Sequence, residues 1–380
     1  MDRVRLGVVG LGNMGSTHIR GHLPQLPRLE LTAVCDTNPV RMEGYEVAKF
    51  DSSEALIRSG LVDAVLVCTP HYAHTTIGID AMQNGLHLLV EKPVSVHKAD
   101  AERLVAAHRE GLVFAAMFNQ RTDPRYRKVR DLVRSGELGE IRRASWTITD
   151  WFRTAAYYAS GGWRATWAGE GGGVLLNQCP HNLDLFQWIL GRPDRVTAHL
   201  GLGRFHDVEV EDSVTAFMEW ENGATAVFTT TTGEAPGTNR MEIAGDRGKV
   251  VVEDGRITFW RTRGSVQAFL DADPGSFSTP EVWRCEVPPA SGGGDQHVGI
   301  LRNFADAILD GVPLVAPAEE GIASVELANA MILSGLQKRT VELPLDAAEY
   351  EGVLQGLIAG SRAKAAVNDE GPADLAASYR

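Results

Sequence analysis

The sequence predicts two domains of the α/β class. The first is a doubly wound parallel sheet, and the second is an α+β domain with a large open sheet that is mostly antiparallel. Three observations predict this fold. The chain of 380 residues is long for a single hydrophobic core. Its first third alternates short apolar runs with helical patterns, whereas the remainder holds long runs rich in Thr, Val, Phe and Trp. We place the domains at residues 1–122 and 123–380.

The first apolar run leads into a glycine-rich turn. Residues 4–9 have the composition of a strand buried on both faces. They are followed by Gly-Leu-Gly-Asn-Met-Gly at 10–15 and by a segment, 16–23, that can be helical. A strand, a Gly-x-Gly-x-x-Gly turn and a helix in this order are typical of a Rossmann domain that binds a dinucleotide. The alternative is a glycine turn in another α/β fold.

Each glycine of this turn has a separate predicted role. Gly10 permits the tight turn, Gly12 lets the backbone approach a diphosphate, and Gly15 lets helix and strand pack closely. The N–H groups at the start of the following helix favour phosphate groups. Asn13 and Met14 lie between the glycines and are further candidates for cofactor contacts.

Asp36 predicts which dinucleotide is bound. It follows the next apolar run, 29–35, and lies at about the 20-residue spacing from Gly15 that is expected for the carboxylate holding the adenosine ribose. A carboxylate repels the 2′-phosphate of NADP, so we expect NAD, with NADP less favoured. Arg41 lies a few residues later and weakens that preference.

Three further strands are predicted at 64–69, 86–91 and 113–119, with helices at 75–84 and 98–109. Ligands of such sheets bind beyond the carboxyl ends of the strands. The candidates for cofactor contacts that follow these strands are Thr69, Pro70, His71, His74, Glu91, Lys92, Asn119 and Arg121. His71 and His74 also suggest a metal, but no carboxylate or cysteine cluster accompanies them in the sequence. We therefore expect no metal, and we expect these histidines to line the nicotinamide ribose or to cap a helix.

The second domain is predicted to begin with a helix at 124–134. A further helix is predicted at 180–190, and two follow at 297–309 and 319–338. Asn222-Gly223 is a strong hairpin signal between two strands. Strand patterns lie at 142–151, 195–203, 214–220, 224–232, 240–244, 249–253 and 256–260, with a turn at 245–248 and a Pro-, Gly- and Ser-rich loop at 268–294. A sheet of this width can carry a subunit interface on its outer face.

Lys92 is the first candidate for chemistry. It lies in a Glu-Lys-Pro sequence at the end of a strand predicted to be buried, at the mouth of the cofactor cleft. Burial removes part of the hydration of a lysine and lowers its pKa, so that it can exchange a proton near neutral pH. The alternative is a solvated lysine that ends a strand, which is the usual case for this residue type.

His181 is the second candidate. A glycine-rich run, 171–173, leads to Pro180, which can open a helix at its first turn. His181 then lies in this first turn, where the helix dipole disfavours its charged form, and Asp184 lies on the same face. A neutral imidazole suits a base or a hydrogen-bond partner for a hydroxyl. The alternative is a histidine that caps the helix and packs against its neighbours.

An aromatic segment, 157–167, holds two Tyr, two Trp and one Arg beside glycines. Sugar sites combine aromatic faces with polar groups, because sugars have apolar C–H faces and polar hydroxyls. The alternative is a packed aromatic corner between the domains. The candidates for substrate contacts are Tyr158, Trp163, Arg164, Trp167, Asn177 and Asp184, with Trp151 and His297 as further candidates for the same pocket.

Composition argues against several classes of partner. A formal charge of −12 argues against nucleic acid and anionic membranes. No apolar run reaches the roughly 18 residues of a membrane span, and the N-terminal residues lack a signal-peptide pattern. The four cysteines are scattered without a Cys-x-x-Cys pair, which indicates a reduced, cytoplasmic protein.

Combined, these motifs resemble the Gfo/Idh/MocA oxidoreductases (glucose–fructose oxidoreductase, inositol dehydrogenase and relatives) over essentially the whole chain. The resemblance rests on the glycine turn at 10–15, Glu-Lys-Pro at 91–93 and His-Asn-Leu-Asp at 181–184, with lesser matches at 63–74 and 303–308. It implies an N-terminal Rossmann domain and a second domain whose open sheet often forms oligomers. It also implies NAD(P)-dependent redox chemistry on sugars, cyclitols or their derivatives.

The resemblance further implies roles for single residues. The Lys and His that lie at the reacting carbinol in the family correspond to Lys92 and His181. Its Trp-Arg pair beside cofactor and substrate corresponds to Trp163 and Arg164. The peptide bond before Pro93 is often cis in the family, and we predict a cis bond here.

Asn177 departs from the family pattern. Inositol dehydrogenase-like members carry Asp four residues before the catalytic His, where this chain has Asn177. An amide cannot act as a base, so the proton must pass through Lys92 or His181, while Asn177 can still bond a substrate hydroxyl. This departure makes the chain look closer to the branches that oxidise sugar lactones, anhydrosugars and glycosides.

We predict from these observations an NAD-dependent dehydrogenase. It would move hydride between nicotinamide and a secondary alcohol or ketone of a sugar, anhydrosugar, glycoside or cyclitol, and by resemblance it would form a homodimer or homotetramer. Two alternatives stay open: an enzyme that cleaves glycosides through transient oxidation by NAD, and a non-catalytic sensor of NAD and sugar. Retention of both Lys92 and His181 argues against the sensor.

Overall fold

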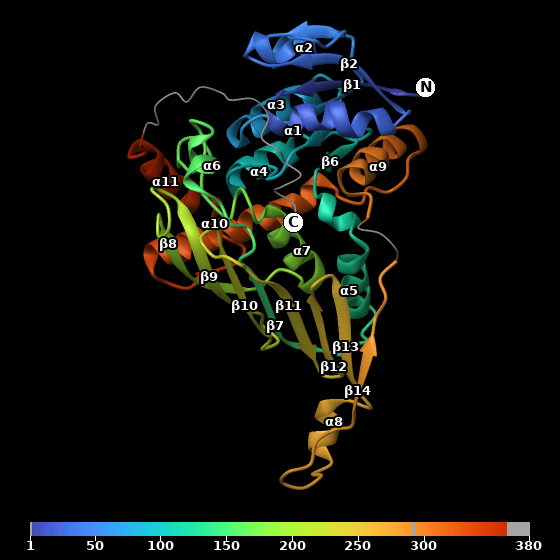
Figure 1. The fold of residues 1–380 in the computed structure, drawn as a ribbon, viewed down its shortest axis with the longest axis vertical. Helices are drawn as coiled ribbons and strands as arrows, with labels where there is room; N and C mark the ends of the chain where they lie inside the picture. Colours follow the sequence, from blue (N-terminus) through green and yellow to red (C-terminus); the bar gives the residue numbers. More distant parts are fainter. Residues whose placement is uncertain (1, 291–293, 363–380) are drawn as a thin grey trace.

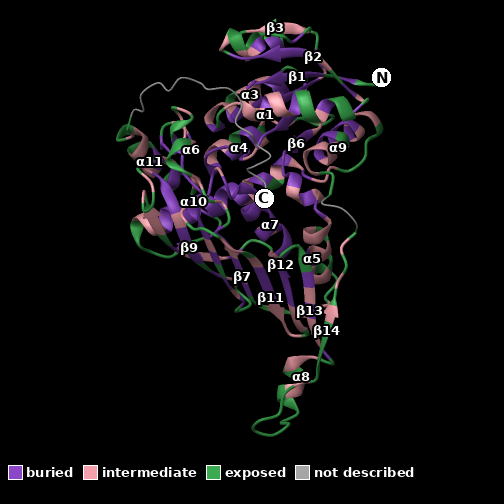
Figure 2. Ribbon diagram, viewed as in Figure 1, coloured by how far each residue is buried: buried purple, intermediate pink, exposed green. Residues whose placement is uncertain are grey.

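The computed structural model describes residues 2–290 and 294–362. Within them the chain forms two sheets, with helices between the two (Figure 1). Most of these intervening helices are buried, whereas the segment around α8 (Val266–Asp271) is exposed (Figure 2). In this part of the chain no helix combines the length and the apolar composition needed to cross a membrane.

The N-terminal sheet has six parallel strands in the order β3-β2-β1-β4-β5-β6, which confirms the doubly wound fold. Its strands are β1 Val4–Val9, β2 Leu29–Cys35, β3 Ala48–Phe50, β4 Ala64–Val67, β5 His87–Val90 and β6 Phe114–Ala116. The short edge strand β3 was not predicted. The last strand ends at Ala116, three residues earlier than predicted. The apolar Met117 and Phe118 suggested a longer strand because they are buried, but they lie outside the paired residues.

The helices of this half of the chain connect successive strands. They are α1 Asn13–Thr17, α2 Ser53–Ile57, α3 His71–Gln83 and α4 Lys98–Ala106. A π-helical turn, His18–His22, continues α1, and 3-10 turns lie at Leu23–Gln25, Pro39–Met42 and Asn119–Thr122. The predicted helix after the glycine turn is therefore present, but its second turn is wound more loosely than an α-helix.

The glycine turn needs its glycines for the predicted reasons. Gly10 has φ +92°, and a Cβ there would lie 2.8 Å from the backbone of Cys68. A Cβ at Gly15 would lie 1.9 Å from the carbonyl oxygen of Gly10. At Gly12, by contrast, no atom of the described residues lies within 4 Å of the Cβ position, so the backbone there is open to a ligand.

The second sheet has nine strands in the order β14-β13-β12-β11-β7-β10-β9-β8-β15. Only β7 and β10 pair in parallel, so the predicted antiparallel character is confirmed. Gly223, with φ +86°, forms the predicted hairpin between β9 and β10. The strands are β7 Ile141–Ile148, β8 Arg195–Leu202, β9 Glu211–Glu219, β10 Thr225–Thr231, β11 Asn239–Gly245, β12 Gly248–Glu253, β13 Arg256–Thr262, β14 Val282–Glu286 and β15 Val341–Glu342.

Helices cover one face of this sheet. The buried helix α10 (Gly321–Gln337) contacts β8, α7 (Pro180–Leu190) and α4, and so lies between the two halves of the molecule. The remaining helices are α5 Pro124–Arg134, α6 Ala155–Ala159, α9 Gln296–Asp310 and α11 Ala347–Ala359, with a 3-10 turn at Ala318–Glu320. The other face of the sheet is open, and Phe217 and Val227, paired across β9 and β10, are 42% and 39% exposed on it.

The prediction of a loop at 268–294 was wrong in part. The segment begins within α8, and β14 then pairs with β13 as the edge strand of the sheet. Its Pro-, Gly- and Ser-rich flanks hid this short strand, and three of its residues, 291–293, lie outside the described residues. In Figure 1 the α8 segment extends away from the end of the sheet.

Part of the C-terminal sequence packs on the N-terminal sheet. Ile300, Leu301 and Phe304 of α9 belong to the same hydrophobic cluster as β1 and β4. The amide of Ala116 in β6 donates to the carbonyl of Ala316 at 3.0 Å. The first core is thus completed by a segment that the sequence analysis placed in the second domain.

Candidate active site

Asp36 is held against the glycine turn. Its Oδ2 accepts a hydrogen bond from the Leu11 N–H at 2.7 Å, and its Oδ1 accepts from the Asn38 N–H at 2.8 Å. Nη1 of Arg41 lies 3.6 Å from Oδ2. The carboxylate thus stands beside the open backbone at Gly12, which fits a ribose next to a diphosphate. Arg41 is the group that a 2′-phosphate would meet.

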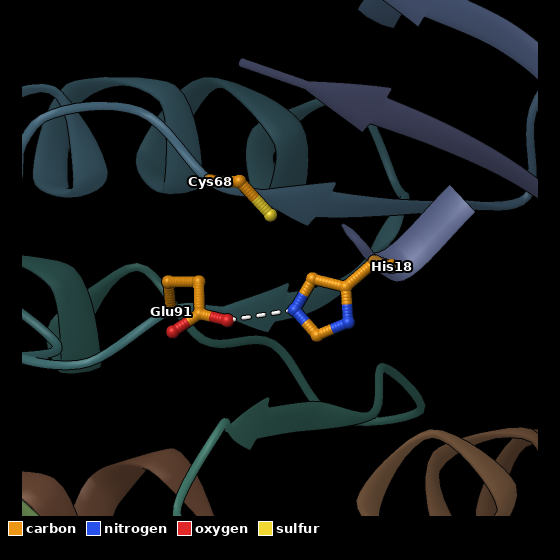
Figure 3. A group of neighbouring side chains, drawn as sticks. All are labelled: His18, Cys68 and Glu91. Atoms are coloured by element: carbon orange, nitrogen blue, oxygen red, sulfur yellow. Dashed lines mark hydrogen bonds and ion pairs between the residues drawn. The ribbon is translucent and has the colours of Figure 1, made fainter. Parts of the chain in front are cut away.

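Glu91 lies under this turn in a buried hydrogen-bond network. Its Oε1 is 2.7 Å from Nε2 of His18 (Figure 3). Its Oε2 accepts from the Lys92 N–H at 3.2 Å. Burial opposes the charged form, but the hydrogen bond and charge of His18, with His297 and Lys92, outweigh it and lower the pKa of Glu91. Nδ1 of His18 lies 2.9 Å from Nδ1 of His22. The sequence analysis did not identify His18 and His22, although their spacing of one helical turn was visible.

One group of three possible metal ligands occurs in the described residues: His18, Cys68 and Glu91, whose ligand atoms lie within 4.8 Å of one another (Figure 3). His18 and Glu91 are bonded to each other, and burial raises the pKa of the Cys68 thiol, which keeps it protonated. Both features disfavour a metal. The predicted lack of a metal site stays a prediction.

Lys92 reaches from the first sheet into the second half of the chain. Its peptide bond to Pro93 is cis, as predicted. Its Nζ donates to the carbonyl oxygen of Asn177 at 2.9 Å. Burial lowers its pKa, Glu91 and Glu170 oppose that shift, and the nearby arginines add to it. A lysine with a lowered pKa can give or accept a proton nearer neutrality than a solvated one.

His181 lies four residues after Asn177, in the first turn of α7 as predicted. It is 5% exposed, its ring meets Phe118 edge-on at 6.5 Å, and its Nδ1 has no hydrogen-bond partner in the described part of the chain. Burial, with the charge of Lys92, lowers its pKa well below the usual value, so the imidazole is neutral. A neutral ring nitrogen near Lys92 is available to a substrate hydroxyl.

The aromatic segment contributes an ordered polar cluster. The guanidinium of Arg164 lies over the rings of Trp163 and Tyr157, at 4.7 Å from each centroid, and its Nη1 donates to the Tyr157 hydroxyl at 2.9 Å. Trp163 also meets His71 edge-on at 5.6 Å. The sequence analysis named Tyr158 instead of Tyr157. The two tyrosines are consecutive in the sequence, and only the fold shows that the hydroxyl of Tyr157 faces Asn177.

Several predicted site residues have their polar groups directed at protein neighbours. Tyr158 and Trp167 lie in the second core, and Asn119 donates from Nδ2 to Gln296 at 2.9 Å. His71 begins α3, and both ring nitrogens of His74 lie 2.8 Å from backbone carbonyls, those of Thr69 and Pro93. The ring of His74 contacts carbonyl oxygens and not the free N–H groups of a helix start, so these contacts do not show the predicted helix-capping role. The contacts of these two histidines with a cofactor stay predictions.

Arg121 and Asp184 form a buried ion pair. The guanidinium donates twice to the carboxylate, at 2.7 and 2.6 Å, and also to Glu320. The side chains of Arg121 and Asp184 are 0% and 1% exposed. Burial opposes the charge of Arg121, but the two carboxylates outweigh it and raise its pKa. This arrangement favours a role in joining the halves of the molecule over the predicted contacts with cofactor and substrate.

A cleft of about 910 Å³ lies between the two halves of the molecule. Lys92 and His181 lie outside its lining, but His297, which lines it, acts electrostatically on both. The lining residues include Met14, His22, Asn119, Trp151 and His297. The predicted cofactor contact Met14 and the further substrate candidates Trp151 and His297 therefore share one cleft.

Two family models match the chain. The model described as "Oxidoreductase family, NAD-binding Rossmann fold" matches residues 4–117, and that described as "GFO/IDH/MocA C-terminal domain" matches residues 126–251. Among named proteins, myo-inositol 2-dehydrogenase of Thermotoga maritima is 25% identical over 358 residues, which cover 90% of this chain and 98% of that protein. The NAD(+)-dependent scyllo-inositol 2-dehydrogenase of Bacillus subtilis is 26% identical over 368 residues, with coverages of 92% and 99%.

Solved structures share the fold. The WlbA dehydrogenase of Bordetella pertussis, in complex with NADH and UDP-GlcNAcA, has a TM-score of 0.78 at 25% identity and covers 91% of this chain and 99% of its own. A levoglucosan dehydrogenase in complex with NADH and levoglucosan has a TM-score of 0.73 at 20% identity, with coverages of 90% and 99%. At that identity the second likeness shows the fold alone.

Proposed function

This chain belongs to the Gfo/Idh/MocA family of oxidoreductases and binds NAD through its N-terminal Rossmann domain, and from this membership we propose that it is a dehydrogenase of sugars, cyclitols or their derivatives. The observation that carries the proposal is the hydrogen bond that holds Lys92 against the segment just before His181. Nζ of Lys92, which follows a strand of the first sheet, donates to the backbone carbonyl of Asn177, four residues before His181 in the second half of the chain.

Lys92 and His181 are the proposed catalytic residues. Bound NAD⁺ supplies the acceptor for the hydride that leaves the carbinol carbon. The neutral amine of Lys92 takes the hydroxyl proton, so that a carbonyl forms as the C–H bond breaks. His181 accepts or donates a hydrogen bond at the same oxygen. In the reverse direction the ammonium of Lys92 returns the proton to the alkoxide.

Three further side chains are proposed to orient the ring of the substrate. Trp163 would offer an aromatic face, Arg164 would offer N–H donors, and the Asn177 amide would bond a hydroxyl of the substrate. The named relatives support a polyhydroxylated ring as substrate, because they include dehydrogenases of myo- and scyllo-inositol. The exact sugar is left to a panel of substrates.

Glycoside cleavage through transient oxidation is a second candidate. It would use the same Lys92 and His181, but it would release an aglycone without net formation of NADH. Measuring NADH absorbance together with substrate consumption distinguishes the two reactions, because only a dehydrogenase forms NADH in step with consumption of the substrate.

We also propose a homodimer or homotetramer that uses the open face of the second sheet. The exposed pair Phe217 and Val227 on that face supports this, because apolar side chains gathered on a sheet face favour burial against a partner. A cytoplasmic location, predicted from the cysteines, stays a prediction.

The test of the proposed reaction is Lys92→Met. The variant keeps the length of the side chain but cannot exchange a proton, so we expect kcat with NAD⁺ and an active sugar or cyclitol to fall by about 10²- to 10⁴-fold. Binding of NADH, followed by fluorescence, should stay unchanged. Lys49→Met, on an exposed residue of β3, is the matched control and should keep full activity. Undiminished turnover in Lys92→Met would reject the assignment.

A further inference from the structure

Glu170 is a buried carboxylate beside the proposed reaction centre. It is 1% exposed, and both of its oxygens accept hydrogen bonds, Oε1 from the side-chain amide of Asn177 and Oε2 from the Ala165 N–H at 2.6 Å. Its backbone carbonyl lies 3.2 Å from Nδ1 of His71. The carboxylate is therefore fixed in place, and it is fixed against a predicted substrate-binding residue.

The bond to Glu170 sets the orientation of the Asn177 amide. Because Nδ2 of Asn177 donates to Glu170, Oδ1 faces the Tyr157 hydroxyl at 3.3 Å. That hydroxyl accepts hydrogen bonds from Arg164 at 2.9 Å and from Gln178 at 3.1 Å. A tyrosine has one hydroxyl hydrogen, and this hydrogen is left for Oδ1 of Asn177. The donor and acceptor of each hydrogen bond from Glu170 through Asn177 to Tyr157 are then set by the carboxylate of Glu170, which can only accept.

Asn177 also connects Glu170 to Lys92. Nζ of Lys92 donates to the backbone carbonyl of the same asparagine, so one residue separates the carboxylate from the ammonium. Glu91, the other carboxylate acting on Lys92, already shares its Oε1 with His18. The remaining charged and titratable groups that act on Lys92 or that Lys92 acts on are Arg153, Arg164, His71, His74, Cys179, His181 and His297.

We propose that Glu170 is a positioning residue for the reaction: its carboxylate holds the Asn177 amide in one orientation and supplies, beside Lys92, a negative charge that residue 177 itself lacks. The inference rests on the proposed function of Lys92. It gives Asn177 the role of a connector, which needs no proton exchange at the amide. Burial raises the pKa of Glu170, whereas Arg164, the Ala165 N–H, the Asn177 amide and Lys92 favour its charged form. The proposal gives that charge a use beyond packing.

Glu170→Gln separates charge from shape. The glutamine can accept from Ala165 with its oxygen and donate with its nitrogen to Oδ1 of a flipped Asn177, so both contacts of residue 170 are kept, while Nδ2 of Asn177 replaces Oδ1 beside the Tyr157 hydroxyl. The negative charge is lost, and the ammonium form of Lys92 loses a favourable neighbour. Lys92 should therefore deprotonate at a lower pH than in the wild-type protein. A purely structural role for Glu170 predicts no such change.

The experiment measures the titration of Lys92 without any substrate. The full-length protein is labelled with acetic anhydride across a pH series, and peptide mass spectrometry gives the labelling midpoint of each lysine. We expect the Lys92 midpoint to move to lower pH in Glu170→Gln. Lys49, which is exposed, and Lys98, which is paired with Glu326 at 2.7 Å, are internal controls whose midpoints should not move. An unchanged Lys92 midpoint in folded Glu170→Gln would overturn the proposal.

A charge swap provides the second arm. The double variant Glu170→Gln/Asn177→Asp keeps one amide and one carboxylate in the pair but exchanges their positions. We expect it to return the Lys92 midpoint toward the wild-type value, and a double variant that titrates like Glu170→Gln would also overturn the proposal. Where turnover is found, the acid limb of the oxidation profile should move with the labelling midpoint, without a change in KM for NAD⁺. A midpoint that moves in a protein without dehydrogenase activity supports the role of Glu170 and rejects the proposed function instead.

Discussion

At the scale of single residues, the site residues that can be predicted from the sequence are those at a fixed spacing from a predicted strand. Gly10, Asp36 and Lys92 each follow a strand, and the chain itself fixes the distance between strand and residue. Glu170 has no such spacing, because its partners Ala165 and Asn177 come within hydrogen-bond distance only when the glycine-rich segment folds around it. Buried charges far from a strand end therefore escape sequence reasoning even when they adjoin the site.

Asp36 makes a testable difference between the two cofactors. Asp36→Ser removes the charge that repels a 2′-phosphate and leaves Arg41, now 3.6 Å from the carboxylate, to attract it. We expect the ratio of kcat/KM for NADP⁺ to that for NAD⁺ to rise by about tenfold or more, which corresponds to about 1.4 kcal/mol. Steady-state kinetics with both cofactors measures the ratio.

The control for this change is Glu54→Ser, an exposed acidic residue of α2 in the same half of the chain. It lowers the net negative charge by the same amount and should leave the ratio unchanged. If both variants shift the ratio equally, the effect comes from overall charge, and the role given to Asp36 is wrong.

At the scale of elements, helices with proline at their first turn were predicted to the residue. α5 and α7 begin at Pro124 and Pro180 as expected, because proline fixes φ and lacks the N–H that a helix start leaves unpaired. The π-helical turn after α1 and the edge strand β14 were missed. Neither has a local marker, since the first depends on the packing of His18 and the second on pairing with β13.

The glycine-rich segment before α7 depends on β9. Oε1 of Glu211 accepts from the N–H groups of Gly173 at 2.8 Å and Leu175 at 3.1 Å, and a Cβ at Gly173 would lie 2.0 Å from the Glu211 carbonyl. Burial raises the pKa of Glu211 to about 7, against the effect of these N–H groups. Its second oxygen, Oε2, has no partner in the described residues. The folded protein therefore binds a proton here that the unfolded chain releases at lower pH.

The sign of the resulting pH dependence follows from linkage. The pKa of Glu211 in the folded protein, about 7, lies above the 4.5 that is usual for this residue type. The protonated carboxyl therefore stabilises the fold fully below about pH 4.5, and this stabilisation is lost as pH rises to 7. The loss amounts to about 3 kcal/mol. We expect Glu211→Gln to lack this decline. Urea unfolding of both proteins between pH 4.5 and 8 measures the difference, and parallel curves would exclude the effect.

At the scale of the whole molecule, two of the contacts that join the halves stand out in the described residues. One is the packing of α9 on the N-terminal sheet, and the other is the ion pair of Arg121 and Asp184, which is placed between the 3-10 turn after β6 and helix α7. The sequence analysis predicted both sheets, but it assigned Arg121 and Asp184 to ligands. The packing of the two halves against each other decides which charged residues form ion pairs. No local pattern in the sequence predicts these pairs.

Asp184→Asn tests the importance of this pair for stability. The change leaves the guanidinium of Arg121 buried beside an amide, with Glu320 as its remaining carboxylate, and breaking a buried pair costs about 3–5 kcal/mol. We expect the free energy of unfolding to fall by about 3 kcal/mol. Chemical denaturation, followed by far-UV circular dichroism, gives this value.

Glu320→Gln is the matched control, since it removes the other carboxylate partner of Arg121. The side chain of Glu320 is 49% exposed. Solvent compensates an exposed site, so we expect a loss below about 1 kcal/mol. Equal losses in the two variants would show that burial of Asp184 adds nothing to the pair.

The contact between β6 and the chain near Ala316 has a consequence for synthesis on the ribosome. The edge of the nucleotide-binding half is already translated when Ala116 leaves the exit tunnel, yet the segment that pairs with it emerges about 200 residues later. During that interval the nascent chain carries an unfinished apolar surface. The last part of translation therefore completes the core of the first part of the protein, and early termination would release a product whose nucleotide-binding half is incomplete.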